Sequence, residues 1–212
     1  MPHFRTGWAG SAALAGLLAI GLTLSARAQT TEPKPVTKAQ LDRPVVLPET
    51  LPQIRADHRE ARFSLTAHRA GKNLVLFFLN EQCGVTFYYK KRLQQLQNDF
   101  ESRGFAFVGV RCGKKQHPDE PVDLPELGYL KMPFVEDEGG ALADTFQISQ
   151  SMTFAVIDRT GRLRYRGGVD DRVDAALVKK TPLRDALRAL AAGKPVPVKE
   201  GRSLGCAILP VR

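Results

Sequence analysis

The segment between Asn73 and Cys112 constrains the fold more than any other part of the sequence. It opens with "NLVLFFLN", a continuous apolar run of the length of a strand that is buried on both faces of a parallel sheet. "FAFVGVRC" is a second run of the same kind. Between them the apolar residues recur at helical spacing: Tyr89, Leu93, Leu96 and Phe100. A strand, a helix and a strand in this order predict a right-handed βαβ unit with parallel strands.

The second half of the chain predicts a hairpin followed by a helix. "MTFAVIDRTGRLRYRGGV" holds two β-rich runs around "DRTG", whose Asp and Gly suit a turn. Asp170 and Asp171 follow the hairpin, where we expect a solvated turn. The alternative is that they pair with Arg166 or Arg172. "TPLRDALRALAAG" predicts a helix that begins at Pro182 and ends before Gly193. The order βαβ, a connecting region and ββα predicts an α/β protein with a central mixed sheet flanked by helices.

Residues 1–28 have the pattern of a secretory signal peptide. His3 and Arg5 make a positive start, "AALAGLLAIGLTL" is an apolar run of suitable length, and "ARA" ends at Ala28 in a small-x-small cleavage pattern. The alternative is an uncleaved N-terminal anchor. After cleavage no stretch is long enough to cross a bilayer, so we expect an exported, periplasmic protein without stable membrane insertion.

The rest of the chain divides into three parts. Residues 29–60 are rich in Pro and Thr and predict an extended leader, residues 61–193 predict the folded domain, and residues 194–212 predict an extended tail. Loss of the signal peptide lowers the formal net charge of +9 by two. Because the basic residues are scattered among acidic ones, we expect no nucleic-acid partner.

Three cysteines, Cys83, Cys112 and Cys206, bear on the function. An odd number in an oxidising compartment indicates a reactive thiol, an intermolecular bridge or a buried inert thiol. The chain has no C-x-x-C, and its four histidines show no metal-ligand spacing with the cysteines. We therefore expect no metal site and no other cofactor.

Cys83 follows the first buried strand and precedes the helix. It is thus expected at the edge of the sheet where open α/β folds bind their ligands. Free N–H groups and the dipole at a helix N-terminus stabilise a thiolate and lower a thiol pKa from about 8.5 to roughly 3.5–7.5. A thiolate attacks disulfides and peroxides. The alternative is a buried packing residue.

A redox cycle needs a second thiol, and two cysteines qualify. Cys112 ends the neighbouring strand at the same edge; adjacent strands lie about 4.8 Å apart, and a disulfide needs Cα atoms about 4.4–6.8 Å apart. We slightly favour Cys112 as the partner of Cys83, although an inert, buried strand end explains it equally well. Cys206, on the tail, is the alternative resolving cysteine, or else an anchor that packs the tail onto the domain.

The segment "FFLNEQCGVTFYYKKRL" resembles exported redoxin-domain proteins of the alkyl hydroperoxide reductase/thiol-specific antioxidant family, which belongs to the thioredoxin-like superfamily. There a buried strand leads into a cysteine, followed by Tyr and an Arg-Leu pair on the helix. "ALADTF", "VIDRTGRLRYRGGVDD" and the late "GC-x-I" also match, so the resemblance covers roughly residues 70–208. It implies a thioredoxin-like fold and a redox-active Cys83.

The chain departs from that pattern in three ways. Gly84 replaces the usual Pro, Met152 falls near the position of the cis-proline, and Leu76 and Asn80 stand at the Pro and the Thr or Ser of the peroxiredoxin pattern P-x-x-x-(T/S)-x-x-C. In addition, Thr86 stands at the second cysteine position of a C-x-x-C. A non-proline cis bond costs about 3–4 kcal/mol, so we expect a trans Ser151–Met152 bond. The resemblance implies the following residues around the substrate: Gly84, Thr86, Tyr89, Arg92, Ser151 and Met152.

Three hypotheses about function follow. In the first, the protein is an exported thiol-disulfide oxidoreductase: Cys83 attacks a protein or small-molecule disulfide, and Cys112, Cys206 or an external thiol reductant resolves the mixed disulfide. In the second, it is a one-cysteine peroxide reductase. Asn80 argues against this hypothesis, because the resemblance to peroxiredoxins implies Thr or Ser at that position. In the third, it is a thioredoxin-fold binding or accessory module without turnover, as the missing proline and C-x-x-C favour. We adopt the first.

Overall fold

The computed structural model describes residues 37–54, 61–80, 83–113 and 130–208. All of them belong to one unit of the chain, Pro35–Arg212. The predicted signal peptide lies outside the described residues. Within these ranges no helix combines the length and the apolar character needed to cross a membrane.

The described residues form a seven-stranded mixed sheet with the order β2-β1-β5-β4-β3-β6-β7. The strands β3, β4 and β5 run parallel, whereas β1, β6 and β7 add antiparallel pairs. This confirms the predicted βαβ unit, the hairpin and the mixed α/β sheet. The strands are β1 Leu51–Ile54, β2 Arg62–Phe63, β3 Asn73–Leu79, β4 Phe105–Arg111, β5 Phe134–Glu136, β6 Thr153–Ile157 and β7 Leu163–Gly167.

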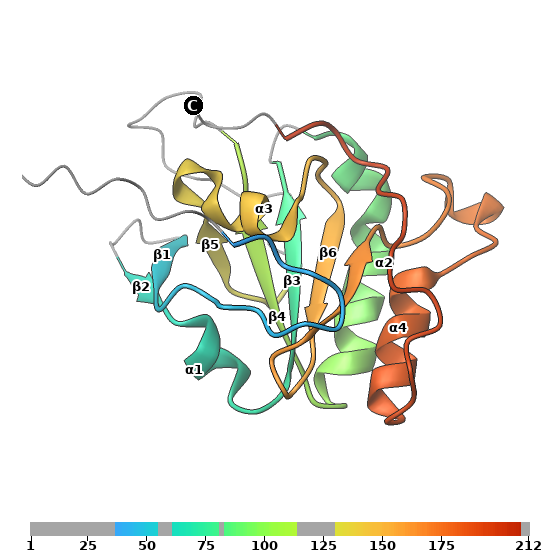
Figure 1. Cartoon of the computed structure of the whole chain (residues 1–212). Helices are drawn as coiled ribbons and strands as arrows, with labels where there is room; N and C mark the ends of the chain where they lie inside the picture. The colour runs from blue at the N-terminus through green and yellow to red at the C-terminus, as the bar shows by residue number, and fades with distance from the viewer. Residues whose placement is uncertain (1–36, 55–60, 81–82, 114–129, 209–212) are drawn as a thin grey trace, which may run out of the picture. The chain divides into compact units, whose positions relative to one another are not determined.

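Helices cover both faces of the sheet (Figure 1). On one face lie α2 (Val85–Glu101) and α4 (Pro182–Ala191), and on the other lie α1 (Leu65–Arg69) and α3 (Ala141–Phe146). Successive residues of β3 point to opposite faces, so alternate side chains enter two separate apolar cores. Every residue of β3 is buried, as expected for a central strand covered on both sides.

The helix ends agree with the sequence signals. The helix α2 begins directly after Gly84, and the chain turns beyond its end at Gly104, which has a φ of 84°. The helix α4 begins at Pro182, where the missing N–H of proline removes no helical hydrogen bond. Two short 3-10 helices, Glu138–Gly140 and Ala175–Leu177, lie in the connecting segments.

The sheet begins earlier in the chain than residue 61, the predicted start of the domain. The strand β1 lies within the segment expected to be an extended leader, yet it pairs with β2 and β5. Its residues alternate weakly in hydrophobicity and contain Pro52, which is compatible with a strand of only two hydrogen-bonded pairs on each side. The pairing therefore depends on β5, which lies about 80 residues further along the sequence.

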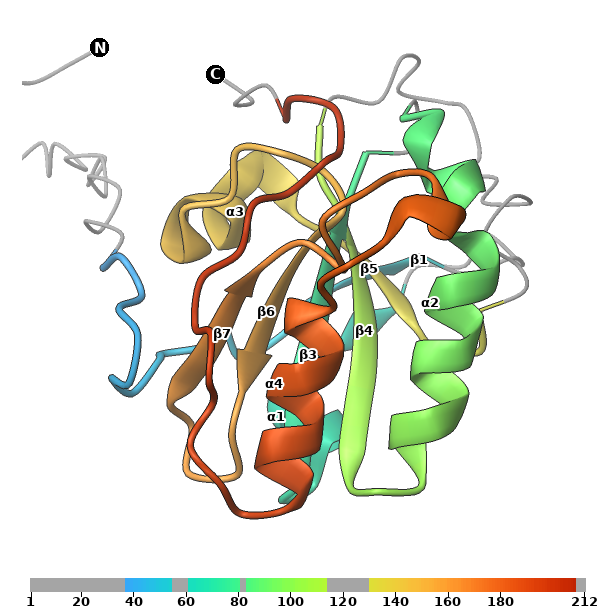
Figure 2. The same cartoon turned by 90° about the vertical axis from the view of Figure 1, so that its right-hand side faces the viewer.

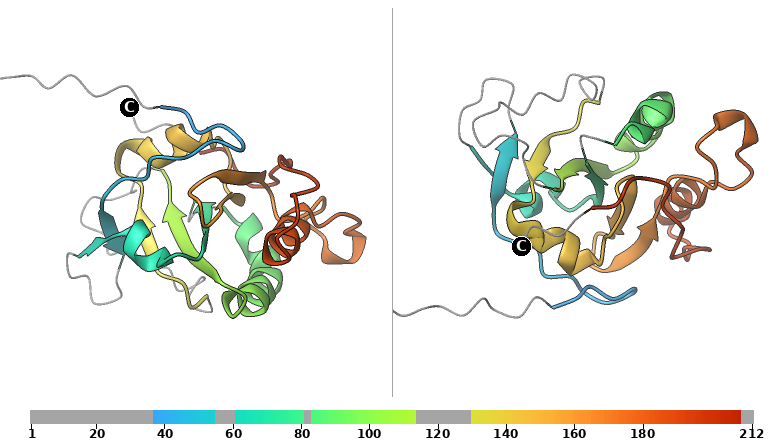
Figure 3. Two further views of the ribbon diagram at one scale, coloured as in Figure 1. Left: turned by 60° about the horizontal axis from the view of Figure 1, so that its bottom comes forward. Right: turned by 90° about the horizontal axis from the view of Figure 1, so that it is seen from above.

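The tail after α4 runs back along the domain in an extended conformation. It rises beside β7 to the edge of the sheet where β3 and β4 end (Figure 2; Figure 3, right). Backbone hydrogen bonds hold it at both ends: Arg166 exchanges bonds with Lys199 and Gly201, and Ile208 N–H donates to the carbonyl of Ser149. At Gly205 a Cβ atom would overlap the carbonyl oxygen of Ser151, so only glycine permits this close approach.

Candidate redox site

Cys83 lies at the junction of β3 and α2, as the sequence predicts. Its N–H donates to the carbonyl of Asn80 at 3.0 Å, and its own carbonyl accepts the N–H of Thr86 at 3.0 Å. The second bond closes a tight turn that carries the chain from Cys83 into the helix. Cys83 is 2% exposed, so the sulfur sits below the protein surface at the N-terminus of α2.

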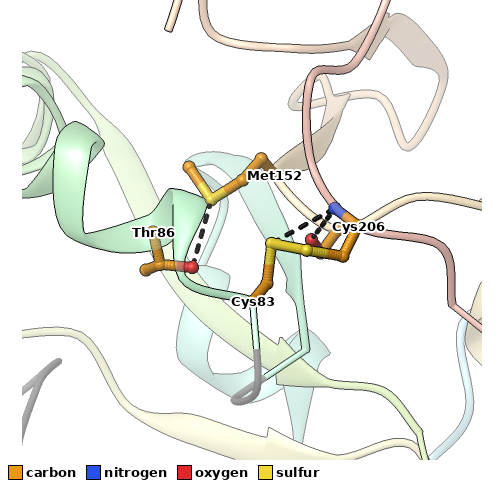
Figure 4. The surroundings of a disulfide bond; sticks show 5 residues. Cys83, Thr86, Met152 and Cys206 are labelled. Carbon is orange, nitrogen blue, oxygen red and sulfur yellow. Dashed lines mark hydrogen bonds between the residues drawn. A yellow bond between two sulfur atoms is a disulfide. The ribbon is translucent and has the colours of Figure 1, made fainter.

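Cys83 forms a disulfide with Cys206 of the tail (Figure 4). Their Cα atoms are 5.6 Å apart, well within the usual range for a disulfide, and 123 positions separate the two residues in the sequence. The slight preference for Cys112 as the partner of Cys83 is therefore wrong for this disulfide. Strand adjacency favoured Cys112, but the tail folds back over the end of β3 and delivers Cys206 instead.

Cys112 is a free, buried thiol at the end of β4. Its Sγ lies 3.8 Å from Oδ2 of Asp137 and 3.7 Å from the carbonyl of Val110. Burial, and then the nearby Asp137 carboxylate, raise the pKa of the Cys112 thiol far above its usual value. A thiol held in this protonated form is a poor nucleophile, so the structure supports the inert strand end that was the alternative for this residue.

Asp137 is itself buried and serves the start of α3. Its carboxylate oxygens accept the N–H groups of Leu142 and Ala143, both at 2.8 Å. Burial raises the pKa of Asp137, while these two N–H groups act in the opposite direction. The pair of Asp137 and Cys112 thus belongs to the packing around α3.

The disulfide is surrounded by Ser151, Met152 and Thr86, all predicted site residues. The N–H of Cys206 points at both Sγ of Cys83, at 3.1 Å, and Oγ of Ser151, at 3.0 Å. The N–H of Ser151 in turn donates to the carbonyl of Cys206 at 2.8 Å. Figure 4 shows Thr86 and Met152 beside this group, with Oγ1 of Thr86 donating to Sδ of Met152 at 3.6 Å. The tail is therefore fastened to the site by hydrogen bonds as well as by the disulfide.

Met152 has an unusual backbone conformation at the position where the family resemblance places a proline. None of the described peptide bonds is cis, so the predicted trans Ser151–Met152 bond is confirmed. Instead, Met152 adopts a φ of 59°. The left-handed region costs a residue with a side chain about 1–2 kcal/mol. The complete burial of the Met152 side chain in the core beneath α2 offsets that cost.

Tyr89 and Arg92 contact Asp170. The guanidinium of Arg92 lies 2.5 Å from Oδ2 of Asp170 and stacks over the Tyr89 ring, and the Tyr89 hydroxyl donates to Oδ1 at 3.1 Å. Burial, and then the Asp170 charge, raise the pKa of Tyr89. Asp170 is only 3% exposed, so the expected solvated turn is wrong for this residue. The loop after β7 folds against α2, a contact that no local pattern signals.

The remaining predicted residue, Gly84, is the exposed N-cap residue of α2. It has a φ of −56°, and an added Cβ would meet no atom within 4 Å. Next to it in sequence, the rings of Phe87 and Tyr88 are largely exposed on the first turns of α2. Within the described ranges, no group of three or more His, Cys, Asp or Glu side chains is placed to bind a metal ion.

A mixed sheet with a disulfide at the N-terminus of the helix that follows a central strand is typical of a thioredoxin-like redox protein. Residues 48–166 match the model of the AhpC/TSA family, and the chain belongs to that family. Its function is thiol-dependent redox chemistry, and it is an oxidoreductase that acts on thiols or peroxides.

Comparison with solved structures supports the same fold. An uncharacterized conserved protein from Geobacillus kaustophilus is 28% identical with a TM-score of 0.65, over 82% of this chain and 92% of that one. A hypothetical protein from Sinorhizobium meliloti 1021 is 22% identical with a TM-score of 0.64, and the match covers 82% of this chain and 95% of that one. A putative protein disulfide isomerase from Bacteroides thetaiotaomicron is 17% identical with a TM-score of 0.50, over 73% and 91%. The search of curated proteins finds no match.

Proposed function

We propose that this protein is an exported thiol-disulfide oxidoreductase in which Cys83 and Cys206 alternate between two thiols and one disulfide. The observation that carries the proposal is the Cys83–Cys206 disulfide at the N-terminus of α2. The N-terminus of a helix stabilises a thiolate, and an extended tail allows its partner to approach and withdraw.

In the oxidising half of the cycle, the Cys83 thiolate attacks one sulfur of a substrate disulfide. A bond forms between Cys83 and that sulfur, and the other substrate sulfur leaves with the electron pair as a thiolate. The Cys206 thiolate then attacks Sγ of Cys83 and releases the second substrate sulfur. The substrate gains two electrons, and the protein is left with the Cys83–Cys206 disulfide.

In the reducing half, an external thiolate attacks the protein disulfide. Cys206 is an exposed residue whereas Cys83 is 2% exposed, so the external thiolate is assigned to Sγ of Cys206. Attack there breaks the bond to Cys83, which leaves with the electron pair as a thiolate at the start of α2, where the free N–H groups and the helix dipole stabilise a negative charge. A second external thiol then frees Cys206 and departs as part of a low-molecular-weight or protein disulfide.

Reduction of peroxide is the second candidate, because the chain belongs to the AhpC/TSA family. In that reaction the Cys83 thiolate attacks one oxygen of the peroxide, becomes a sulfenic acid and releases water or an alcohol. Condensation with the Cys206 thiol then gives the same disulfide and releases one molecule of water. Asn80, at the position where the resemblance expects Thr or Ser, argues for a disulfide substrate.

The two reactions are separated by giving the reduced protein one equivalent of either oxidant. With 2-hydroxyethyl disulfide we expect the Cys83–Cys206 bond to close rapidly, and with hydrogen peroxide we expect it to close at least ten times more slowly. Alkylation and peptide mapping measure how fast the bond forms. The reverse order of rates would make the protein a peroxide reductase. Failure of both oxidants to close the bond would remove the proposal altogether.

Export rests on residues 1–28 and agrees with the chemistry of the site, because disulfides persist in oxidising compartments. N-terminal sequencing of the protein from a periplasmic extract should begin at Gln29. A chain that retains Met1 and sediments with membranes would instead indicate the uncleaved anchor.

A further inference from the structure

A polar pocket of about 450 Å³ lies between the tail and the segment that connects α3 to β6. Gln147–Gln150 form one wall and Glu200–Ser203 the other, with Thr153, Arg166 and Gly167 completing the lining. The volume is that of a small-molecule site, too small for the surface of a protein partner.

Two backbone bridges bracket the pocket. One joins Arg166 to Glu200, and the other joins Gln150 to Ala207, which follows Cys206 directly. Between these bridges the tail and the connecting segment separate and leave the pocket open. One end of it therefore closes at the bridge from Gln150, which lines the pocket, to Ala207, the residue after Cys206. A ligand that extends from the pocket past this bridge comes to the Cys206 half of the disulfide, which an external thiol must attack.

The pocket depends on the docked tail, which provides an entire wall. Because the disulfide fastens the tail to the site, the pocket is complete in the oxidised protein. A molecule that acts on the oxidised protein is a reductant. The occupant of the pocket is therefore a thiol.

The charges of the lining indicate what kind of thiol it is. Arg166 forms an ion pair with Glu200 and donates to the carbonyl of Phe146, so its charge is already engaged. Arg202 is exposed, and in the described part of the chain no ion pair of its side chain is found. Thr153 and Ser203, whose hydroxyls are 2.6 Å apart, and the wall residues Ser149 and Gln150 add neutral polar groups. A guanidinium beside such groups suits a carboxylate.

We propose that this pocket binds a small thiol that bears carboxylate groups, and that Arg202 holds a carboxylate while the thiolate attacks Sγ of Cys206. The sulfur–sulfur bond to Cys83 breaks, Cys83 takes the electron pair, and the thiol remains joined to Cys206. A second molecule of the thiol attacks this mixed disulfide and leaves as the oxidised dimer. The inference rests on the proposed function and adds to it the chemical class of the reductant.

The test measures how fast three thiols open the disulfide in the oxidised full-length protein, followed by alkylation and mass spectrometry. Mercaptosuccinate carries two carboxylates, 2-mercaptoethanol is neutral, and cysteamine is a cation. The matched variants are Arg202→Glu and Lys194→Glu. Both reverse one exposed positive charge, but Lys194 lies at the far end of the tail, just beyond α4. The ratio of wild-type to variant rates cancels the intrinsic reactivity of each thiol.

We expect Arg202→Glu to lower the rate at which mercaptosuccinate opens the disulfide by about tenfold or more, which corresponds to about 1.4 kcal/mol. The rate with 2-mercaptoethanol should change less than twofold. Lys194→Glu should leave all three rates near those of the wild type, and Arg202→Gln should give an intermediate loss with mercaptosuccinate. With mercaptosuccinate the wild-type rate should also saturate as concentration rises, because binding precedes reaction.

Equal slowing of all three thiols by Arg202→Glu, an equal effect of Lys194→Glu, or no effect of either would overturn the pocket assignment. In those cases the proposed function survives as long as 2-mercaptoethanol still opens the bond at Cys206. If none of the three thiols opens the disulfide in the folded protein, the proposed function itself fails. The two failures are thus distinguishable.

Discussion

A buried carboxylate, that of Asp170, joins two elements near the redox site. Asp170 is shared by Arg92 and Tyr89, two residues that the family resemblance implies around the substrate. In the structure they fasten the loop after β7 to α2. A charge in such a position is stabilising only while its partner is present, because an unpaired buried charge is costly.

Asp170→Asn is therefore expected to lower the free energy of unfolding by about 2–4 kcal/mol, less than for a fully buried pair because Arg92 keeps some contact with water. Urea denaturation measures the change. The control is Asp171→Asn, at a less buried carboxylate that accepts backbone N–H groups, where a change within about 0.5 kcal/mol is expected. A stable Asp170→Asn protein with slow disulfide exchange would instead place Tyr89 and Arg92 at the substrate.

His68 is the second residue whose surroundings predict a measurable effect. Burial lowers its pKa, and its Nε2 lies 3.3 Å from the carbonyl of Phe107. As the pH falls below the unfolded-state pKa of about 6.5, the unfolded chain binds a proton that the folded protein does not. Stability is thus present above that pH and is lost as the pH falls toward the lowered pKa. Between pH 7 and 5, His68→Gln should show a smaller loss of unfolding free energy than the wild type; an identical pH profile would contradict this.

At the scale of elements, the start of α2 and the path of the tail shape the site. The turn that leads into α2 has Gly84 at its second position, closed by the bond from Thr86 N–H to the Cys83 carbonyl. Proline is favoured at that position of such a turn, and a φ of −56° suits its ring. This chain has Gly84 instead of proline at that position.

Gly84→Pro is expected to raise the free energy of unfolding by about 0.4–1 kcal/mol, because proline reduces the conformational freedom of the unfolded chain. Chemical denaturation under reducing conditions isolates this effect from the disulfide. Gly84→Ala is the matched control, since it adds a Cβ in the same free space but keeps the N–H. A loss of stability in the proline variant alone would show that the Gly84 N–H makes a necessary bond.

The tail reaches Cys83 only because Gly205 lies directly against Ser151. Gly205→Ala should push the tail outward by steric overlap and weaken the disulfide by about 1–3 kcal/mol, a shift of about 20–60 mV toward a more oxidising potential. Equilibration with glutathione redox buffers measures the potential. Ala207→Ser changes an exposed neighbour on the same segment and should leave it unaltered. An unchanged potential in Gly205→Ala would mean that the tail adapts without loss.

For the whole molecule, the disulfide is a crosslink between the centre of the sheet and the end of the described chain. The two cysteines are 123 positions apart in the sequence, and closing so long a loop removes much conformational entropy from the unfolded state. Redox state and global stability are therefore linked in this protein.

The oxidised wild type should exceed Cys206→Ser in free energy of unfolding by about 3–5 kcal/mol. Urea denaturation of the oxidised protein, the reduced protein and the variant measures the difference. Under reducing conditions the wild type and Cys206→Ser should agree within about 0.5 kcal/mol, which serves as the control. Equal stability of the oxidised wild type and the variant would show that closing the bond strains the fold as much as it constrains the unfolded chain.

Much of the sheet and its helices was predictable from the sequence because the signals are local. The apolar runs of β3 and β4, the helical period of α2 and the turn residues between β6 and β7 each specify their own element. Right-handed connection of parallel strands then orders them. The position of Cys83 follows from the same rules, because it lies between β3 and α2, whose local patterns predict both elements.

What the tertiary structure alone decided is which distant segments meet. The pairing of Cys83 with Cys206, the burial of Asp170 against α2 and the strand β1 beside β5 each join residues far apart in the sequence. An extended tail has no period that states where it docks. Its position depends on shape, on Gly205 fitting against Ser151 and on the bridges at either end. Local periodicity therefore determined the elements, and long-range packing determined the chemistry of the site.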